Sequence, residues 1–357
     1  MYKPTLMIAA FALSCYAQSK TIEGTHHTIS YEGRISKHYT DGSVTFNWPG
    51  TQVKTRLIGK KLSVKLAGFG DQFDVLINGQ LYKKILTSYS GEPENFVLFE
   101  SENPADVIIE LVKRWENYEH NSRIFKFEMD GQTEGVVKSQ PHILFIGDSI
   151  SAGFGSESSK RDCDWQEIVN TSNARVAFPY LSAKSLGASF TQVSYSGLGL
   201  IRNWSGNQPH HTIRTYTDRL SALFSDKTEF EDRFPNLIII EVGTNDFSTD
   251  PQNGEPWQTI SDVENAWVSE MVAYTLQIRS RYPAVPIVYM PRPAYPYDLI
   301  IPATEKAMTL LKDNEVSQLY SHVFSSTFEG CVWHPTQTEH QAISKDLVEF
   351  IKKQALL

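Results

Sequence analysis

The stretch HILFIGDSI, residues 142–150, decides the fold of the larger part of this chain. It begins with a continuous apolar run, as in a central strand of a parallel sheet that is buried on both faces. The run ends in Gly147, which permits a sharp turn. Residues 237–242 (LIIIEV) and 285–290 (VPIVYM) have the same character, and the first of them also ends at a glycine. We predict that the three runs are neighbouring strands of one parallel sheet.

Helical patterns separate and follow these runs. Apolar residues recur at three-to-four spacing from Asp262 to Arg281, and a second pattern covers Ala303 to Tyr320. Thr336 and Glu339 have the spacing of a capping box, which predicts a last helix that reaches about Lys353. Alternating strands and helices predict a doubly wound α/β domain over residues 141–357.

The preceding residues, 20–135, have a different pattern. Short alternating segments are separated by turn residues, which favours a β-sandwich or jelly roll. Asn78-Gly79 between two such segments is a strong hairpin signal. We predict no chemistry in this domain: Trp115 and Tyr118 could touch a sugar, but core packing or incidental exposure explains them better.

The N-terminus has the features of a targeting segment. A short basic start, an apolar run from Leu6 to Leu13 and small residues around Ala17 predict a secretory signal peptide over residues 1–17. A lipoprotein signal that uses Cys15 fits less well, because a leucine stands where a small residue is usual. No later segment is apolar enough to cross a membrane, so we expect a secreted protein, in the periplasm or the medium.

Composition narrows the function of the exported chain. The chain has 357 residues, 41% of them hydrophobic and 21% charged, with a formal net charge of -8. An acidic chain without a basic block is unsuited to nucleic acid or to an anionic membrane surface. It suits a neutral substrate, and we expect a monomer.

Two cysteines remain once the signal peptide is removed. In an exported chain, Cys163 and Cys331 favour a disulfide, and two separate buried thiols are the alternative. A bridge between them would tie the segment after Ser149 to the loop that carries His334. No metal-ligand spacing appears, although His334 lies nearby, and we expect no metal.

Four groups of residues follow predicted strands or precede the last helix, where sites form in open α/β sheets. Ser149 would stand at the head of a helix, as a nucleophile or as an ordinary N-cap. The glycines of residues 196–199 could aim N–H groups at an oxyanion, or form a simple turn. Asn245 could donate its amide or form an Asx-turn. His334 could act as a base, and His340 is a weaker candidate.

Together and in this order, the four groups resemble the sequence blocks of the GDSL/SGNH hydrolase superfamily over residues 141–357. The resemblance implies a flavodoxin-like parallel sheet, with Ser149 as nucleophile and His334 as base. It places the oxyanion hole at the N–H of Ser149, the N–H of Gly197 and the Asn245 side chain, with Gly199 as the alternative to Gly197. No cofactor is implied.

A narrower resemblance extends to nearly the whole mature chain. A β-sandwich before the SGNH domain, the motif Ser-Gly-x-Gly-x-x-Arg-Asn at 196–203 and Cys-x-Trp-His-Pro at 331–335 are similar to the family-two carbohydrate esterases. This resemblance implies removal of acetyl groups from plant polysaccharides such as xylan and glucomannan. Trp333 and Trp204, and less clearly Trp165, are candidates for stacking on a sugar ring, although buried packing explains each of them about equally well.

The chain departs from the superfamily pattern at one position. An aspartate usually stands three residues before the histidine, and here that residue is Cys331. Either a backbone carbonyl holds the Nδ1 proton of His334, which gives a serine–histidine dyad, or Asp162, Asp164 or Glu329 reaches in. We favour the dyad.

The sequence therefore predicts a secreted serine esterase that acts on acetylated polysaccharide or oligosaccharide. Two other functions remain open. A lipid esterase or thioesterase could use the same fold, although no long apolar lid is evident. A non-catalytic carbohydrate-binding protein would bind glycan without turnover.

Overall fold

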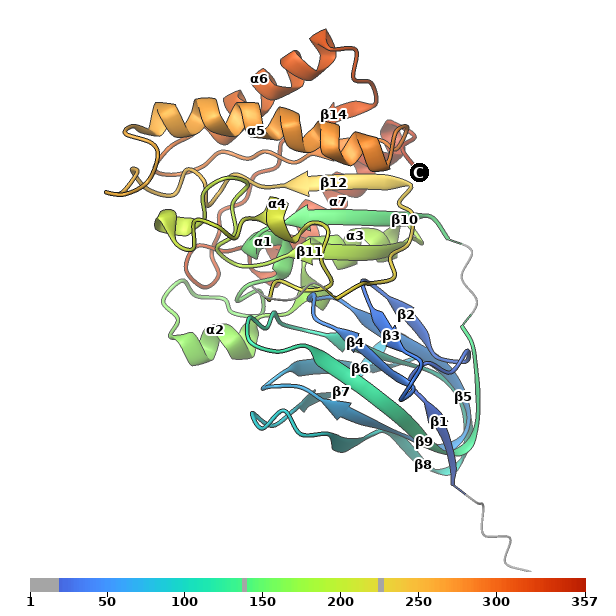
Figure 1. The fold of residues 1–357 in the computed structure, drawn as a ribbon. Coiled ribbons are helices and arrows are strands. Elements are labelled where there is room, and N and C mark those ends of the chain that lie inside the picture. Colours follow the sequence, from blue (N-terminus) through green and yellow to red (C-terminus); the bar gives the residue numbers. More distant parts are fainter. Residues whose placement is uncertain (1–18, 137–139, 224–227) are drawn as a thin grey trace, which may run out of the picture.

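A computed structural model describes residues 19–136, 140–223 and 228–357 of the chain. The predicted signal peptide and Cys15 lie outside the described residues. Figure 1 shows an antiparallel β-domain below a domain with helices on both faces of a sheet. In the described part, no helix combines the length and the apolar character needed to cross a membrane.

The N-terminal domain contains one connected antiparallel sheet of nine strands. Its main path is β3-β4-β9-β5-β8-β6-β7, with β1 paired to β9 and β2 to β5. The Asn78-Gly79 hairpin is confirmed: both residues have left-handed φ angles, 51° and 78°, between β6 and β7. The strands are β1 (Lys20–Glu23), β2 (Ser30–Glu32), β3 (Ser36–His38), β4 (Ser43–Phe46), β5 (Gln52–Ala67), β6 (Gln72–Ile77), β7 (Gln80–Leu86), β8 (Glu94–Lys113) and β9 (Ser122–Glu134).

The second domain contains a parallel sheet in the order β11-β10-β12-β13-β14. In chain order this is 2-1-3-4-5, the flavodoxin-like arrangement that the resemblance implied. The direction of winding reverses between β10 and β12, so the residues that follow these two strands meet at the switch point. The strands are β10 (His142–Gly147), β11 (Ser189–Ser194), β12 (Leu237–Glu241), β13 (Ile287–Tyr289) and β14 (Leu319–Ser321).

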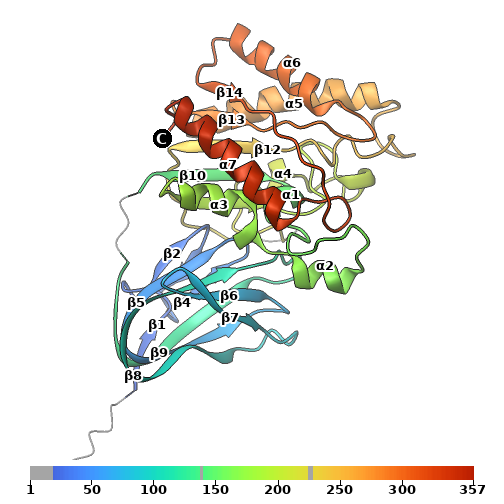
Figure 2. The same ribbon diagram turned by 180° about the vertical axis from the view of Figure 1, so that it is seen from behind.

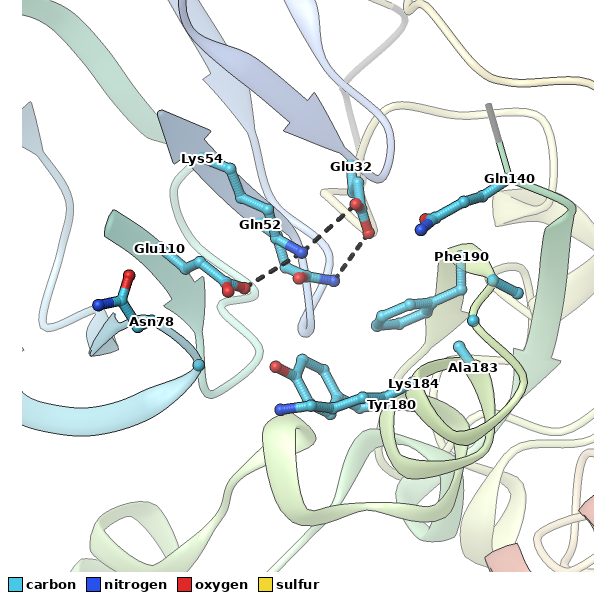
Figure 3. A pocket seen from close by; sticks show the side chains of 13 residues that line it. Glu32, Gln52, Lys54, Asn78, Glu110, Gln140, Tyr180, Ala183, Lys184 and Phe190 are labelled. Carbon is cyan, nitrogen blue, oxygen red and sulfur yellow. Dashed lines mark hydrogen bonds and ion pairs between the residues drawn. The ribbon is translucent and has the colours of Figure 1, made fainter. Parts of the chain in front are cut away.

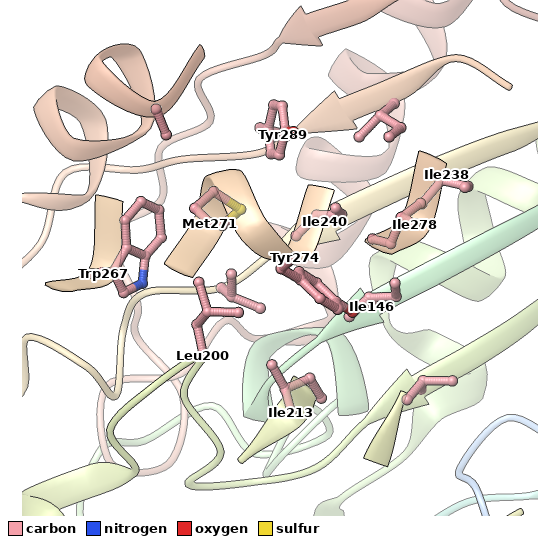
Figure 4. Close-up of a cluster of buried hydrophobic side chains, with 14 of the residues drawn as sticks. Ile146, Leu200, Ile213, Ile238, Ile240, Trp267, Met271, Tyr274, Ile278 and Tyr289 are labelled. Atoms are coloured by element: carbon pink, nitrogen blue, oxygen red, sulfur yellow. The ribbon is translucent and has the colours of Figure 1, made fainter. Parts of the chain in front are cut away.

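Two layers of helices bury the two faces of this sheet. Leu144 and Ile146 of β10 pack in the cluster with α5 and α6, and Ile143 and Phe145 pack in the cluster with α3 and α7. Figure 2 shows α3 and α7 across one face, and Figure 4 shows the cluster on the other. The helices are α1 (Ser149–Ala152), α2 (Trp165–Thr171), α3 (Phe178–Ser185), α4 (Ile213–Tyr216), α5 (Ile260–Arg281), α6 (Ile300–Asp313) and α7 (Gln337–Lys353), with short 3-10 turns at Ala174–Val176 and Trp204–Gly206.

One predicted helix is too long. The pattern from Ala303 to Tyr320 predicted a single helix, but α6 ends at Asp313 and residues 319–321 form the edge strand β14. Glu315 and Gln318 have left-handed φ angles of 60° and 57°, which break the helix. The hydrogen bonds that β14 makes to β13 outweigh the helical preference of the sequence.

Charged residues join the two domains on the side of α3. Arg114, which is fully buried just after β8, binds Asp74 at 2.7 Å and Glu157 at 2.7 Å. Figure 3 shows a second polar contact region, a pocket of about 300 Å³ where Lys54 of β5 bridges Glu32 and Glu110 and faces Tyr180 of α3. The Arg114–Glu157 ion pair crosses between the domains and holds the β-domain against the domain that carries Ser149, whereas the ion pairs of Lys54 stay within the β-domain.

Candidate active site

Ser149 and His334 form a hydrogen-bonded pair although 185 positions separate them. Ser149 is separated from β10 by Asp148 alone and is the first residue of α1, with 5% of its surface exposed. Asp148 caps this short helix, because its Oδ1 accepts the Ile150 N–H at 2.9 Å. Ser149 Oγ lies 2.8 Å from His334 Nε2, within reach for proton transfer.

Two backbone carbonyls hold the other ring nitrogen of His334. Nδ1 lies 3.0 Å from the oxygen of Cys331 and 2.9 Å from that of Val332. These contacts select the tautomer with hydrogen on Nδ1, which leaves Nε2 as the acceptor that faces Ser149.

The three acids that could have reached the histidine are all exposed, and two of them have other partners. Asp164 caps α2 by accepting the Glu167 N–H, and Glu329 binds Arg161 at 3.0 Å. Asp162 is exposed. The geometry is therefore that of a dyad supported by backbone.

A strained turn points both carbonyls at the histidine. The N–H of His334 donates to Cys331 O at 3.1 Å, and the two central residues, Val332 and Trp333, have φ angles of 49° and 54°. Two consecutive left-handed residues define a type I′ turn, which normally uses Asn and Gly. A β-branched residue such as Val332 is a genuine outlier there and costs about 1 to 2 kcal/mol.

Two tethers hold this turn in place. The predicted disulfide is present between Cys163 and Cys331. Arg161 adds backbone and side-chain contacts: its carbonyl accepts the Val332 N–H at 2.9 Å, and its guanidinium donates to Phe328 O at 2.9 Å. The segment after Ser149 and the loop of His334 are thus joined covalently and by hydrogen bonds.

The histidine is poised as a neutral base. Burial lowers the pKa of His334 to about 4, although the carbonyls of Cys331 and Val332 oppose the shift. Phe154 lies against the ring, with the two centroids 4.3 Å apart. At neutral pH the unprotonated imidazole can therefore take a proton from Ser149.

Hydrogen bonds account for nearly every N–H group in the loop 196–202. Ser196 donates to Glu116 at 2.8 Å and Gly199 to Asn203 at 3.0 Å, while the amides of residues 200–202 all donate to Asp246 at 2.8 to 3.0 Å. Leu198 makes a longer bond, 3.4 Å, to Tyr195 O.

Gly197 is the exception in this loop. Among the residues that the structure describes, none accepts the Gly197 N–H, and a Cβ at this position would meet nothing within 4 Å. The space around Gly197 is open, as an oxyanion donor requires. Gly199, the alternative, already uses its amide, and a Cβ there would collide with Arg202 O.

Asn245 lies between the serine segment and this loop. Its Nδ2 donates to Leu198 O at 2.9 Å and lies 3.4 Å from Asp148 Oδ2. One amide hydrogen is thus firmly held while the second makes only a long contact. Asn245, which follows β12, therefore contacts both the segment of Ser149 and the loop 196–202.

Buried acids surround the base of the site. Burial raises the pKa of Asp148 to about 6. Burial also raises the pKa of Glu241, which accepts a hydrogen bond from Ser151 at 2.8 Å. Arg292 offsets part of this negative charge and donates to Thr244 Oγ1 at 3.1 Å.

A cleft of about 630 Å³ opens beside His334. It is lined by the loop after β13 and the loop before α7, including Arg292, Tyr295, Phe328 and Trp333. Tyr295 is 94% exposed and Trp333 is 65% exposed, so both rings can contact a ligand. Trp204 and Trp165 are also exposed but do not line this cleft.

The remaining candidates do not join the site. His340 is fully buried; it stacks on Phe178 and accepts that residue's N–H at 3.3 Å, so it is not the partner of Ser149. In the described ranges, one group could hold a metal by distance, Cys163, Glu167 and Cys331, but its two sulfurs are bonded to each other.

Comparison with known proteins defines the class. The family model described as GDSL-like lipase/acylhydrolase matches residues 145–327, more than half of the chain, and the chain belongs to this family. The model described as carbohydrate esterase 2 N-terminal matches residues 31–136.

The relatives are family-two carbohydrate esterases. The acetylxylan esterase/glucomannan deacetylase of Cellvibrio japonicus is 26% identical over 318 residues, which cover 87% of this chain and 86% of the relative. An acetyl xylan esterase from Butyrivibrio proteoclasticus superposes with a TM-score of 0.80 at 19% identity, over 94% of this chain and 98% of that one. A family-two carbohydrate esterase from Clostridium thermocellum in complex with cellohexaose has a TM-score of 0.78 at 21% identity, over 92% and 100% of the two chains.

Sequence reasoning missed several residues of this site. Phe154, Arg292 and Tyr295 lie in loops without a recognisable motif, and only the fold brings them to His334. Glu116 was missed because the β-domain was expected to carry no chemistry. The feature that marks Glu116 is its burial in a loop, and burial cannot be read from a single sequence.

Proposed function

We propose that this protein is a secreted serine esterase that removes O-acetyl groups from plant cell-wall polysaccharide through an acetyl-enzyme. The observation that carries the proposal is the 2.8 Å contact between Ser149 Oγ and the Nε2 of a neutral His334. The similarity to the acetylxylan esterase/glucomannan deacetylase of C. japonicus supports the substrate class.

The proposed reaction has two steps. Ser149 Oγ attacks the acetyl carbonyl carbon while His334 Nε2 accepts the hydroxyl proton. The oxyanion lies among the N–H groups of Ser149 and Gly197 and the amide of Asn245. Collapse of the intermediate breaks the bond between the acetyl carbon and the sugar oxygen, and His334 gives its proton to that oxygen, which leaves as a hydroxyl. Water then attacks the acetyl-enzyme with His334 as base, which releases acetate and restores Ser149.

The cleft beside His334 is the proposed glycan site. Trp333 and Tyr295 offer two exposed aromatic faces on which pyranose rings can stack. Trp204 is a further candidate because its backbone N–H donates to Gly197 O at 2.9 Å. This bond places it next to the loop 196–202, which we call the oxyanion loop. The cellohexaose complex of the C. thermocellum protein supports a site for a β-linked chain.

Secretion rests on two features. The first is the predicted signal peptide at residues 1–17. The second is the disulfide, which persists in oxidising compartments. We propose that the mature enzyme begins near residue 18 and acts as a monomer with both domains.

Replacement of the nucleophile tests the proposal. Ser149→Ala should abolish release of p-nitrophenol from its acetate ester and of acetate from acetylated xylan and glucomannan. Ser182→Ala is the matched control: this serine of α3 is fully buried, its hydroxyl lies 3.0 Å from that of Ser344 of α7, and the variant should retain activity. Wild-type-like turnover by Ser149→Ala would refute the mechanism. A preference for long acyl chains would refute the substrate class and favour a lipid esterase.

A further inference from the structure

The loop between β8 and β9 reaches from the β-domain to the strand end that carries the oxyanion loop. Figure 1 shows this end of the β-domain facing the parallel-sheet domain. Three consecutive residues of the loop, Glu116, Asn117 and Tyr118, contact Tyr195 and Ser196 at the end of β11. The mechanism proposed above uses none of them.

Ser196 is held through both of its backbone polar groups. Its N–H donates to Glu116 Oε2 at 2.8 Å, and its carbonyl oxygen lies 2.8 Å from Tyr118 Oη. Tyr118 Oη also lies 2.9 Å from Glu116 Oε1. Two side chains of the β-domain thus hold one residue that precedes the free amide.

The preceding residue is fixed in the same way. Tyr195 is fully buried, and its hydroxyl donates to Asn47 Oδ1 at 2.7 Å and accepts the Asn117 N–H at 2.8 Å. Its ring packs edge-on against Tyr118, with centroids 4.6 Å apart. Both anchoring residues again come from the β-domain.

The geometry of the peptide bond connects the contacts at Ser196 to the direction of the Gly197 N–H. The carbonyl of Ser196 and the N–H of Gly197 belong to one planar, trans peptide unit, so they point in opposite directions. A bond that fixes the carbonyl therefore also fixes the direction of the Gly197 N–H. The residue after this peptide bond is Gly197, with φ 79° and open space around it. A glycine in open space would not by itself prevent rotation of the peptide plane.

We propose that Tyr118 and Glu116 are positioning residues that aim the Gly197 N–H at the oxyanion. The inference rests on the proposed function, because it presumes that Gly197 is an oxyanion donor. In this proposal the β-domain supports catalysis through Glu116 and Tyr118, which do not contact the reacting atoms.

The protonation of Glu116 fits this arrangement. A phenol has one proton, which Tyr118 can give either to Ser196 O or to Glu116. Burial raises the pKa of Glu116 to about 7. Near neutral pH a protonated Glu116 can donate to Tyr118 Oη, which leaves the phenol proton for Ser196 O.

The experiment compares hydroxyl removal at two tyrosines of the β-domain. Tyr118→Phe should lower kcat for p-nitrophenyl acetate about 10- to 100-fold, less than complete loss of an oxyanion donor, and leave KM within about twofold. Tyr31→Phe is the matched control, because Tyr31 also gives its hydroxyl proton to a backbone carbonyl, Gly24 O at 2.9 Å, far from the site. It should leave kcat unchanged.

Activity is expressed per active site, titrated with a fluorophosphonate that labels Ser149. A merely structural role would lower the titrated fraction and leave kcat per titrated site intact, which would overturn the inference. An unchanged kcat in Tyr118→Phe would overturn it as well. A wild-type enzyme that neither turns over nor reacts with the probe would instead refute the proposed function.

A second pair of variants decides the outcome if Tyr118→Phe does not fold. Glu116→Ala removes the acceptor of the Ser196 N–H, whereas Glu116→Gln keeps an acceptor oxygen and adds a donor toward Tyr118. We expect Glu116→Ala to lose about 10-fold in kcat and Glu116→Gln to stay within about threefold of wild type. Equal activities of the two variants would contradict the proposed role.

Discussion

The two loops that complete the site are held by opposite means. The His334 loop is fixed by a disulfide, by Arg161 and by neutral backbone carbonyls, with strain at Val332. The oxyanion loop is fixed by two buried carboxyl groups, Glu116 and Asp246, which accept its backbone N–H groups. One loop therefore lacks the carboxylate that would orient its histidine, while the other depends on carboxyl groups that accept its N–H groups.

The difference shows how the missing aspartate is replaced. A carboxylate beside His334 would both orient the ring and raise its pKa. The carbonyls of Cys331 and Val332 supply the orientation, but burial keeps the pKa near 4. The arrangement preserves a neutral base and gives up charge stabilisation of the imidazolium.

Among the changes that test the comparison of the two loops, loss of a proposed oxyanion donor should lower kcat the most. Asn245→Ala should lower kcat about 10²- to 10³-fold with little change in KM, because the proposed role of the amide is to donate to the oxyanion, which forms in the transition state. Steady-state kinetics on p-nitrophenyl acetate measure this. Gln258→Ala, at an exposed residue before α5, serves as the control. A change confined to KM would show that Asn245 binds substrate and does not stabilise the oxyanion.

Removal of the disulfide should have the next largest effect. The paired change Cys163→Ala and Cys331→Ala should lower kcat about 10- to 100-fold, because the His334 turn loses its covalent tether. It should also destabilise the protein by about 2 to 5 kcal/mol. Kinetics at 20 °C and thermal unfolding separate the two effects.

Reduction provides the control for the disulfide. Dithiothreitol should bring the wild type toward the paired variant and leave the variant itself unchanged. Full activity of a folded, disulfide-free enzyme would show that Arg161 and the carbonyls suffice to hold the turn.

The pH profile should report the lowered pKa of the buried His334. Only unprotonated His334 can accept the serine proton, so activity is lost as pH falls through its pKa. With that pKa at about 4, kcat/KM should be half its plateau near pH 4 and fall about tenfold per unit below. Short assays that return the enzyme to pH 7 exclude acid unfolding. Half-loss at the ordinary histidine value would show that burial does not lower the pKa of His334 in the working enzyme.

Relief of turn strain should have the smallest effect. Val332→Asn places a residue that tolerates left-handed backbone at a position where the valine is 45% exposed. We expect a stabilisation of about 0.5 to 1 kcal/mol and a Tm higher by about 1 to 4 °C, with kcat unchanged. Thr51→Asn, at a buried position of the β-domain, is the contrasting change and should destabilise. A lower Tm for Val332→Asn would show that the valine side chain is needed in the turn.

Much of the fold followed from local pattern. Continuous apolar runs identified β10, β12 and β13, and the Asn78-Gly79 pair identified a hairpin. The helix predicted to end at Tyr320 failed because pairing along the sheet edge overrode propensity. Such a failure is expected where a weak local preference competes with non-local hydrogen bonds.

The sequence by itself determined the order of the chemical groups: a serine after the first strand, glycines after the second, an asparagine after the third and a histidine before the last helix. Spacing along a chain encodes this, because parallel strands bring their carboxyl ends to one edge. The tertiary structure alone decided what holds these groups. The carbonyls on His334, the open space around Gly197 and the hydrogen bonds of Glu116 and Tyr118 to Ser196 depend on backbone direction and on contacts between distant residues. Backbone direction and contacts between distant residues cannot be read from the residue types of a single sequence.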